Sequence, residues 1–163
     1  AACEEWKELD RGSWRAMEEL YRAGRVRAIG VSNFLPHHLE NLLEVCTVPP
    51  MVDQIEFHPG YVQWETVEFC RASQILVEAW SPLGRQRLAD DPLLAELAGK
   101  YGVSQAQICL RFALDCGVVP LPKSADAGRM RQNLALDFAL EAEDLERLRT
   151  MPQTGWSGLH PDK

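Results

Sequence analysis

The sequence predicts an α/β fold built around a parallel sheet. Four short runs rich in apolar and β-branched residues alternate with segments of helical periodicity. These runs are nearly continuous in apolar residues, which is typical of strands covered by helices on both faces. No G-x-G-x-x-G sequence occurs, and its absence disfavours the doubly wound dinucleotide-binding fold. A length of 163 residues suits one domain, so we expect residues 1–163 to form a single unit.

Apolar spacing and terminating residues define the first elements. Residues 13–23 carry apolar side chains at a helical period and end at Gly24, a residue type that favours helix C-termini. The β-branched run 26–31 predicts the first strand. Pro36 opens the next helix, because its fixed φ suits the first helical turn.

The middle of the chain repeats this alternation. Residues 51–57 and 75–80 predict the second and third strands, and residues 64–72 between them predict a helix. Residues 93–101 have helical spacing and stop at Gly102.

The last third adds one strand and three helices. Ser104 is expected to cap a helix, because its hydroxyl can accept a hydrogen bond from a first-turn amide. Residues 118–121 predict the fourth strand. Helices follow at residues 127–136 and 141–149, and residues 151–163 form a tail that contains Pro and Gly.

Composition and charge exclude several classes of function. The net charge of -7 argues against nucleic-acid or anionic-membrane binding, which needs a basic face. No apolar run reaches the roughly 20 residues of a membrane span, and the first residues are acidic rather than signal-like. The five cysteines are odd in number and include no C-x-x-C pair, which favours reduced structural thiols and a cytoplasmic protein.

Polar and aromatic residues gather where the predicted strands end. They are Ser32, Asn33, Gln54, Glu56, Trp80, Ser81, Lys123 and Ser124. Ligands of parallel α/β proteins bind at the carboxyl ends of strands. We therefore expect a ligand site built from these residues.

The residue types at three strand ends match parts of a nicotinamide dinucleotide. Ser32, Asn33 and Gln54 offer a hydroxyl and two amides, which are the donors and acceptors that a carboxamide needs. Trp80 offers an aromatic face for the flat nicotinamide ring. The tight segment from Ser81 through Leu83 to Gly84 allows the backbone to approach a pyrophosphate, with two arginines nearby.

The fourth strand end carries the groups that a 2′-phosphate needs. Lys123, Ser124 and Arg129 supply an ammonium, a hydroxyl and a guanidinium around the start of a helix, where the helix dipole also favours an anion. Gln132 and Asn133 lie one turn further along, towards the adenine. The set predicts NADP(H) as the cofactor.

Each part of this set also has a purely structural interpretation. Ser32 and Asn33 suit capping of the helix that begins near Pro36. Trp80 taken alone suits core packing, and Lys123 with Ser124 suits a surface loop. The ligand interpretation depends on their joint placement at four successive strand ends.

Four segments resemble the aldo-keto reductases in order and spacing: residues 24–34 (GRVRAIGVSNF), 54–59 (QIEFHP), 80–84 (WSPLG) and 121–124 (LPKS). The resemblance covers almost all of residues 13–163 and is nearest to the prokaryotic group that includes diketogulonate reductases. It implies a (β/α)8 TIM-barrel family fold, of which this chain is the C-terminal half. It also implies NADPH-dependent reduction of small aldehydes or ketones.

The resemblance assigns roles to the strand-end residues. It implies that Ser32, Asn33 and Gln54 hold the carboxamide and that Trp80 stacks on nicotinamide, where many members have Tyr. Ser81, Leu83 and Gly84 lie along the pyrophosphate, and the adenosine 2′-phosphate and adenine contact Lys123, Ser124, Arg129, Gln132 and Asn133. The tail, residues 151–163, resembles the substrate loop, in which Trp156 is a candidate for substrate contact or for core packing.

The sequence departs from the family pattern at two positions and in one larger respect. Asp53 stands where members usually have Asn, and strand alternation points it away from Gln54. Gln86 replaces a frequent glycine of the pyrophosphate loop. The family's catalytic Asp, Tyr, Lys and His belong to the first four strands, so we expect no catalytic residue and no metal ligand in this chain. Residues 1–12 are interpreted as the remnant of a preceding loop.

A half-barrel has physical consequences for partners. Four strands alone leave two open sheet edges, which invite pairing with another chain. We expect self-association or a complementing N-terminal half. The alternative is a truncated, catalytically inactive half-barrel that binds NADP(H) or a partner chain without turnover.

Overall fold

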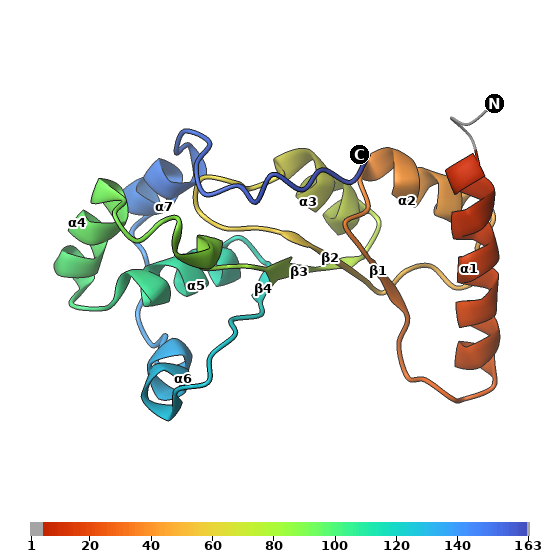
Figure 1. Cartoon of the computed structure of the whole chain (residues 1–163), viewed down its shortest axis with the longest axis horizontal. Helices are drawn as coiled ribbons and strands as arrows, with labels where there is room; N and C mark the ends of the chain where they lie inside the picture. The colour runs from red at the N-terminus through yellow and green to blue at the C-terminus, as the bar shows by residue number, and fades with distance from the viewer. Residues whose placement is uncertain (1–4, 163) are drawn as a thin grey trace. The chain divides into compact units, whose positions relative to one another are not determined.

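A computed structural model of the chain describes residues 5–162. Within that range the chain alternates helices and strands (Figure 1). In chain order the elements are α1 (Glu5–Arg22), β1 (Gly30–Ser32), α2 (Pro36–Leu43), β2 (Val52–Glu56), α3 (Trp64–Ala72), β3 (Leu76–Trp80), the 3-10 helix η1 (Gly84–Gln86), α4 (Pro92–Tyr101), α5 (Gln105–Asp115), β4 (Val119–Pro120), α6 (Ala127–Leu134) and α7 (Ala142–Arg149). The predicted α/β alternation is therefore confirmed.

The strands form one sheet in the order β1-β2-β3-β4. β1 runs parallel to β2, with Ser32 opposite Gln54, and β3 runs parallel to β4, with Ala79 opposite Pro120. Helical crossovers between consecutive strands produce this arrangement, because parallel neighbours cannot be joined by a tight turn.

Two predicted segments differ from the structure. Strand β1 is confined to Gly30–Ser32, because the exposed residues 25–28 pair with no strand, so most of the predicted run 26–31 is a loop. Residues 5–12, expected as a loop, belong to α1. Arg11 explains this: its Nε donates to Asn41 Oδ1 (2.8 Å) and ties the helix to α2. Residues 1–4 lie outside the described range.

The described chain divides into two compact units. Unit 1 runs to Gln54 and includes Trp64–Val77, and unit 2 comprises Ile55–Gln63 with the chain from Glu78 onward.

The core of unit 1 lies between α1 and the loop and strand residues beside it. Trp14, Ile29 and Leu42 are buried together, and α1 lies beside α2 (Figure 1). Trp14 Nε1 donates to the carbonyl of Val48 at 3.0 Å, so the buried indole leaves no unpaired donor.

Glu18 fixes α1 to the loop that follows α2. It is only 4% exposed, and its Oε1 accepts from the amides of Thr47 and Val48, both at 2.7 Å. Burial alone would raise the pKa of Glu18, but these amides, with Arg22 and the Thr47 hydroxyl, lower it overall. The carboxylate thereby joins segments about thirty residues apart.

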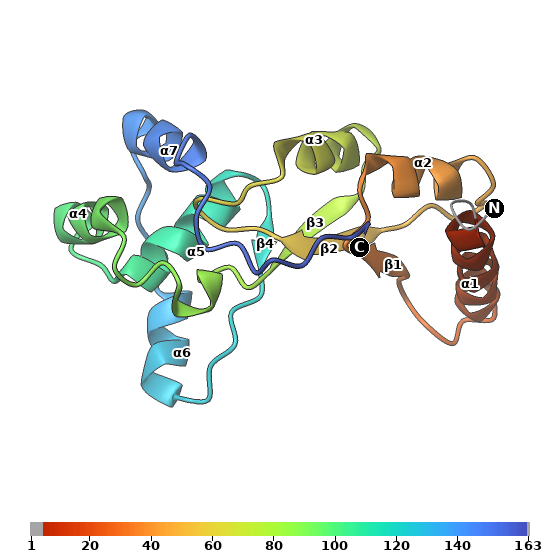
Figure 2. The same ribbon diagram turned by 45° about the horizontal axis from the view of Figure 1, so that its top comes forward.

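In the core of unit 2, helix α5 packs against the strand residues and the neighbouring helices. Phe57 and Phe112 are fully buried with rings stacked at 5.7 Å, and α5 contacts α4, α7 and β4. Figure 2 shows α4 and α7 near each other, and α6 carried on extended segments. No residue of α6 is buried, so this helix contributes surface rather than core.

Asp144 joins two helices of unit 2. Its side chain is buried and accepts from Lys100 Nζ (2.6 Å), from the Tyr101 hydroxyl (2.7 Å) and from Arg147 (3.1 Å). Hydrogen bonds from Lys100 and then Tyr101 hold the pKa of Asp144 below its usual range. These donors offset the cost of burying the carboxylate, and those of Lys100 and Tyr101 join the end of α4 to α7.

Ser104 caps α5 as predicted, accepting from the Gln107 amide. Cys46, Cys70, Cys109 and Cys116 form no disulfide among the described residues, whereas Cys3 lies outside that range. Within residues 5–162 no helix has the length and apolar character that crossing a membrane requires.

Replacing Glu18 by Ala should lower the free energy of unfolding by roughly 2–3 kcal/mol, because the amides of Thr47 and Val48 lose their acceptor. Since the pKa of Glu18 is lowered by folding, its contribution is present at neutral pH and is lost as the pH falls through the folded-state value. Urea titration at pH 7 measures the loss. Glu19→Ala, at the exposed neighbouring position, is the control, and an equal loss in both variants would contradict the assignment.

Candidate functional site

The structure brings Ser32, Asn33 and Gln54 together at the ends of β1 and β2. Ser32 Oγ donates to the Gln54 carbonyl at 2.8 Å, and the Asn33 amide donates to the same oxygen at 3.0 Å. Asn33 has φ +59, a left-handed conformation that Asn tolerates better than most residues. Ser32 and Asn33 are exposed and Gln54 is half-buried, so this trio presents a hydroxyl and two amides at one surface of unit 1.

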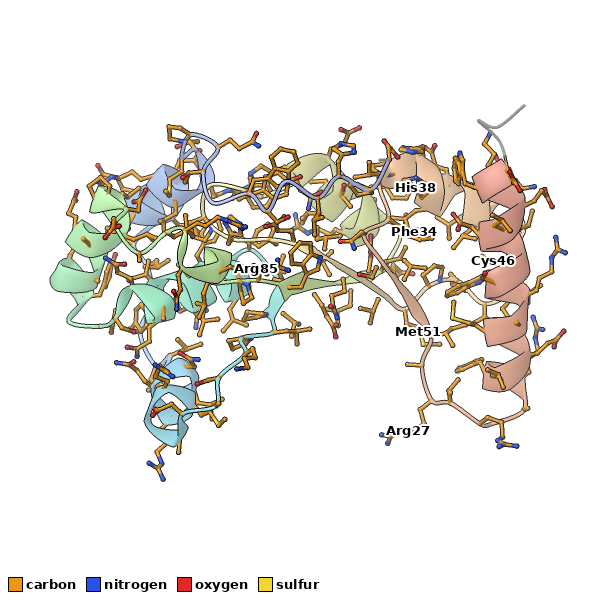
Figure 3. The ribbon with its side chains drawn as sticks, viewed as in Figure 1. Arg27, Phe34, His38, Cys46, Met51 and Arg85 are labelled. Carbon is orange, nitrogen blue, oxygen red and sulfur yellow. The ribbon has the colours of Figure 1, made fainter. Side chains whose placement is uncertain are left out.

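The helix-capping interpretation of Ser32 and Asn33 is wrong. The residue at the N-cap of α2 is Leu35, whose amide donates to His38 Nδ1 at 3.0 Å. Phe34 and His38 lie close together at this turn, with ring centroids 5.5 Å apart (Figure 3). The side chains of Ser32 and Asn33 are therefore not used to cap α2.

Asp53 is buried directly behind the trio. It is fully buried on β2, where its Oδ1 accepts from the Phe34 amide at 3.4 Å and its Oδ2 accepts from Cys70 Sγ at 3.9 Å. Burial raises the pKa of Asp53 to about 7, and the Phe34 amide offsets this only in part. The alternation expected from sequence is confirmed, because Asp53 is in the core while Gln54 reaches the surface.

Trp80 at the end of β3 is half-buried rather than a core residue. The Arg85 guanidinium lies 5.2 Å from the Trp80 ring centroid, and Arg85 Nε donates to Ser81 Oγ at 2.9 Å. Figure 3 labels Arg85 at η1. Ser81 has φ +51, so the strand ends in a sharp left-handed turn that places Trp80, Ser81 and Arg85 together in unit 2.

The loop after Ser81 contains a short helix that the sequence did not predict. Half-buried Leu83 precedes η1, and Gly84 has φ +59 with no room for a side chain, because a Cβ there would lie 2.6 Å from Leu88 Cγ. Gln86 has φ +69, a conformation that favours glycine. The departure from the family glycine therefore adds local backbone strain.

The phosphate-binding candidates lie around the start of α6 in unit 2. Lys123 and Arg129 are exposed. Ser124 Oγ accepts from the Asp126 amide at 3.2 Å, and Asp126 Oδ1 accepts from the Arg129 amide at 2.7 Å. Asp126 is therefore the helix cap, a role that sequence reasoning missed although Asp is a preferred capping residue. Exposed Gln132 and half-buried Asn133 follow along the same helix.

Trp156 of the tail is half-buried, and its ring stacks on Tyr61 with centroids 5.8 Å apart. Its Nε1 is buried without a hydrogen-bond partner among the described residues. Next to it, Ser157 Oγ donates to Glu56 Oε2 at 2.6 Å. Sequence reasoning placed Glu56 at a strand end but did not find this contact, which joins residues 101 apart.

A separate apolar cavity of about 220 Å³ lies between α1 and β1 in unit 1. Trp14, Met17, Val31, Phe34 and Leu42 supply its apolar lining. None of the predicted site residues lines it, so the cavity is distinct from the strand-end candidates.

Comparisons with known proteins agree with these motifs. The sequence profile of the aldo/keto reductase family matches residues 7–151. Glyoxal reductase of Bacillus subtilis is 42% identical over 158 residues, covering 96% of this chain and 57% of the relative. The chain therefore spans little more than half the length of that relative.

Solved structures give the same result. The apo crystal structure of Gox0644 superposes with a TM-score of 0.89 at 36% identity, over 94% of this chain and 57% of that one. The silkworm aldo-keto reductase AKR2E5, crystallised with NADPH, gives a TM-score of 0.83 at 32% identity, over 91% of this chain and 49% of that one. The TIM-barrel family fold expected from the sequence is confirmed.

Asp53 should make the stability of the chain depend on pH. Because its pKa rises from 3.8 to about 7 on folding, the unfolded chain loses this proton first, and stability falls as the pH rises from about 4 to about 7. The full effect is at most roughly 4 kcal/mol. Urea titrations across this range should show the fall in the natural chain and a flatter profile in Asp53→Asn. Asp90→Asn, at an exposed site, should keep the natural profile, and parallel profiles for all three proteins would refute the assignment.

Proposed function

Because the chain belongs to the aldo/keto reductase family, we propose that the protein reduces small aldehydes or ketones with NADPH and that this chain binds the cofactor. The single observation that carries the proposal is the Ser32, Asn33 and Gln54 trio. Its two hydrogen bonds to one carbonyl fix the backbone at the end of β1, where Ser32 and Asn33 are exposed.

The residues present suit a nicotinamide dinucleotide. A carboxamide has one acceptor oxygen and an NH2 donor, and the hydroxyl and amide groups of the trio can serve both. Trp80 is half-buried, and the Arg85 guanidinium lies over its ring, so part of the ring is accessible at the surface of unit 2. Gly84 has φ +59, which allows a tight backbone turn after β3, and such a turn suits close approach of a pyrophosphate.

When bound, the cofactor supplies the hydride for carbonyl reduction. Ser32, Asn33 and Gln54 would hold the nicotinamide through its carboxamide. Trp80 would offer an aromatic face to a nicotinamide ring. Ser81 and Leu83 provide the surface along which the pyrophosphate lies.

Selection of NADPH over NADH is assigned to the start of α6. Lys123 and Arg129 are exposed cations there, and a 2′-phosphate gains charge-assisted hydrogen bonds from such groups. Asp126 is the opposing charge, and its engagement with the Arg129 amide keeps it at the helix end. Ser124, Gln132 and Asn133 complete the surface for the phosphate and adenine.

The substrate and partners follow from the same proposal. The relative named glyoxal reductase makes small dicarbonyl compounds the first substrates to test. Trp156 is the proposed substrate contact of this chain, and the proton donor is expected from the other half of the barrel, either on the same polypeptide or on a complementing chain. Self-association of this chain is the alternative way to cover its sheet edges.

Titration with NADPH, followed by quenching of tryptophan fluorescence, tests the proposal. Lys123→Glu should weaken NADPH binding roughly 10- to 100-fold, because a charge-assisted contact is lost and a repulsive charge is introduced. NADH affinity should change far less, since NADH lacks the 2′-phosphate. Arg27→Glu makes the same charge reversal on an exposed residue of unit 1 (Figure 3) and should leave both affinities unchanged.

Equal NADPH affinity in Lys123→Glu and the natural chain would show that the phosphate site is wrongly assigned. Saturable NADPH binding with no reduction of glyoxal, even after addition of an N-terminal half, would favour the non-catalytic binding module.

A further inference from the structure

The C-terminal tail docks onto the end of β2 within unit 2. The Thr154 amide donates to the Gly60 carbonyl at 3.0 Å. Ser157 then makes two contacts with the Glu56 carboxylate, from its amide to Oε1 at 3.0 Å and from its hydroxyl to Oε2 at 2.6 Å. The tail is therefore held at two points on either side of Trp156.

Two glycines make this close approach possible. Gly60 has φ +85, and a Cβ there would lie 2.5 Å from Thr154 Cγ2. Gly155 has φ +71, and a Cβ there would lie 2.9 Å from Leu88 Cδ2 and 3.0 Å from His58 Cε1. The tail backbone is thus packed directly against His58 and against the loop that follows Gly84, which indicates a specific docked conformation.

The Glu56 carboxylate has few donors other than Ser157. It is 2% exposed, and burying a carboxylate without donors is costly. The His58 Nε2 atom lies 3.5 Å from Oε1 and makes no hydrogen bond among the described residues. His58 Nδ1 lies 2.8 Å from the Pro59 carbonyl, which can only accept, so that nitrogen is committed elsewhere. Ser157 therefore supplies both of the short hydrogen bonds described for this carboxylate.

We propose that Glu56 is a positioning residue that latches the tail through Ser157 and so fixes Trp156 on Tyr61. The latch is a property of unit 2 and needs no cofactor. Its consequence for substrate selection rests on the proposed function, because that assigns Trp156 to the carbonyl pocket. With the latch closed, the Trp156 ring has one position, stacked on Tyr61, and forms a fixed wall rather than a mobile flap.

Hydrogen exchange followed by mass spectrometry on the full chain, without cofactor, tests the latch. Ser157→Ala removes the hydroxyl that bonds Glu56 and that also accepts from the Leu159 amide, and Glu56→Gln removes the charge that both Ser157 donors face. Exchange of the peptide spanning residues 153–159 should speed up about 10-fold or more in each variant. The α5 peptide, Gln105–Asp115, should exchange as in the natural chain.

Three further variants separate positioning from general stability. Ser157→Thr keeps the hydroxyl and should restore slow exchange of the tail. Gln153→Ala lies in the exposed part of the tail, and Glu65→Gln makes the Glu56 change at an exposed position of α3, so neither should alter tail exchange. If Glu56→Gln also speeds hydrogen exchange of the α5 peptide, that variant has lost general stability. The comparison of Ser157→Ala with Ser157→Thr then tests the latch by itself.

Natural exchange of the tail in Ser157→Ala would overturn the latch. NADPH titration of the same variants separates this result from the proposed function. If Lys123→Glu does not weaken NADPH binding, the cofactor site is refuted while the latch stands. If Ser157→Ala speeds exchange of the tail but binds NADPH normally, the latch is supported and the cofactor site also stands.

Discussion

Burial of carboxylates is the constraint on which much of this structure depends. Glu18, Asp53, Glu56 and Asp144 are each less than 5% exposed. A charge in such a position must gather donors, because water no longer provides them. Glu18, Glu56 and Asp144 do so with groups distant in the sequence, and each thereby joins two separate segments of the chain. The loop after α2, the C-terminal tail and helix α7 are fixed in this way.

Asp53 shows what happens when donors are lacking. It has only a long contact from a backbone amide and a weak one from a thiol, and its pKa rises to about 7 where those of Glu18 and Asp144 fall. Burial dominates the pKa of Asp53, whereas hydrogen-bond donors outweigh burial at Glu18 and at Asp144. Asp53 also adjoins the Ser32, Asn33 and Gln54 trio, so the least satisfied carboxyl of unit 1 lies behind its candidate binding surface.

Local patterns predicted the elements well, because helical spacing, strand runs and caps are encoded within a few residues. The Ser104 cap and the α3 bounds follow from such signals. The short β1 and the early start of α1 do not follow from local signals, because both depend on partners elsewhere in the chain. Residues 25–28 pair with no strand, and Arg11 reaches Asn41 thirty residues away. The contact between Glu56 and Ser157 spans 101 residues and has no local signature.

The candidate site follows the same division. Which residue types lie at the strand ends could be read from the chain, and the hydrogen bonds of Ser32 and Asn33 to Gln54 agree with that reading. The backbone conformation at these ends could not be predicted from the sequence, because Asn33 and Ser81 adopt left-handed conformations that neither residue type requires. Such conformations persist only where surrounding bonds outweigh their cost. At Asn33 that bond runs from its own amide to Gln54, and at Ser81 it comes from Arg85 to the hydroxyl. Each strand therefore turns sharply at its end because a neighbouring residue holds it there, and backbone that is already ordered loses little freedom when a ligand binds.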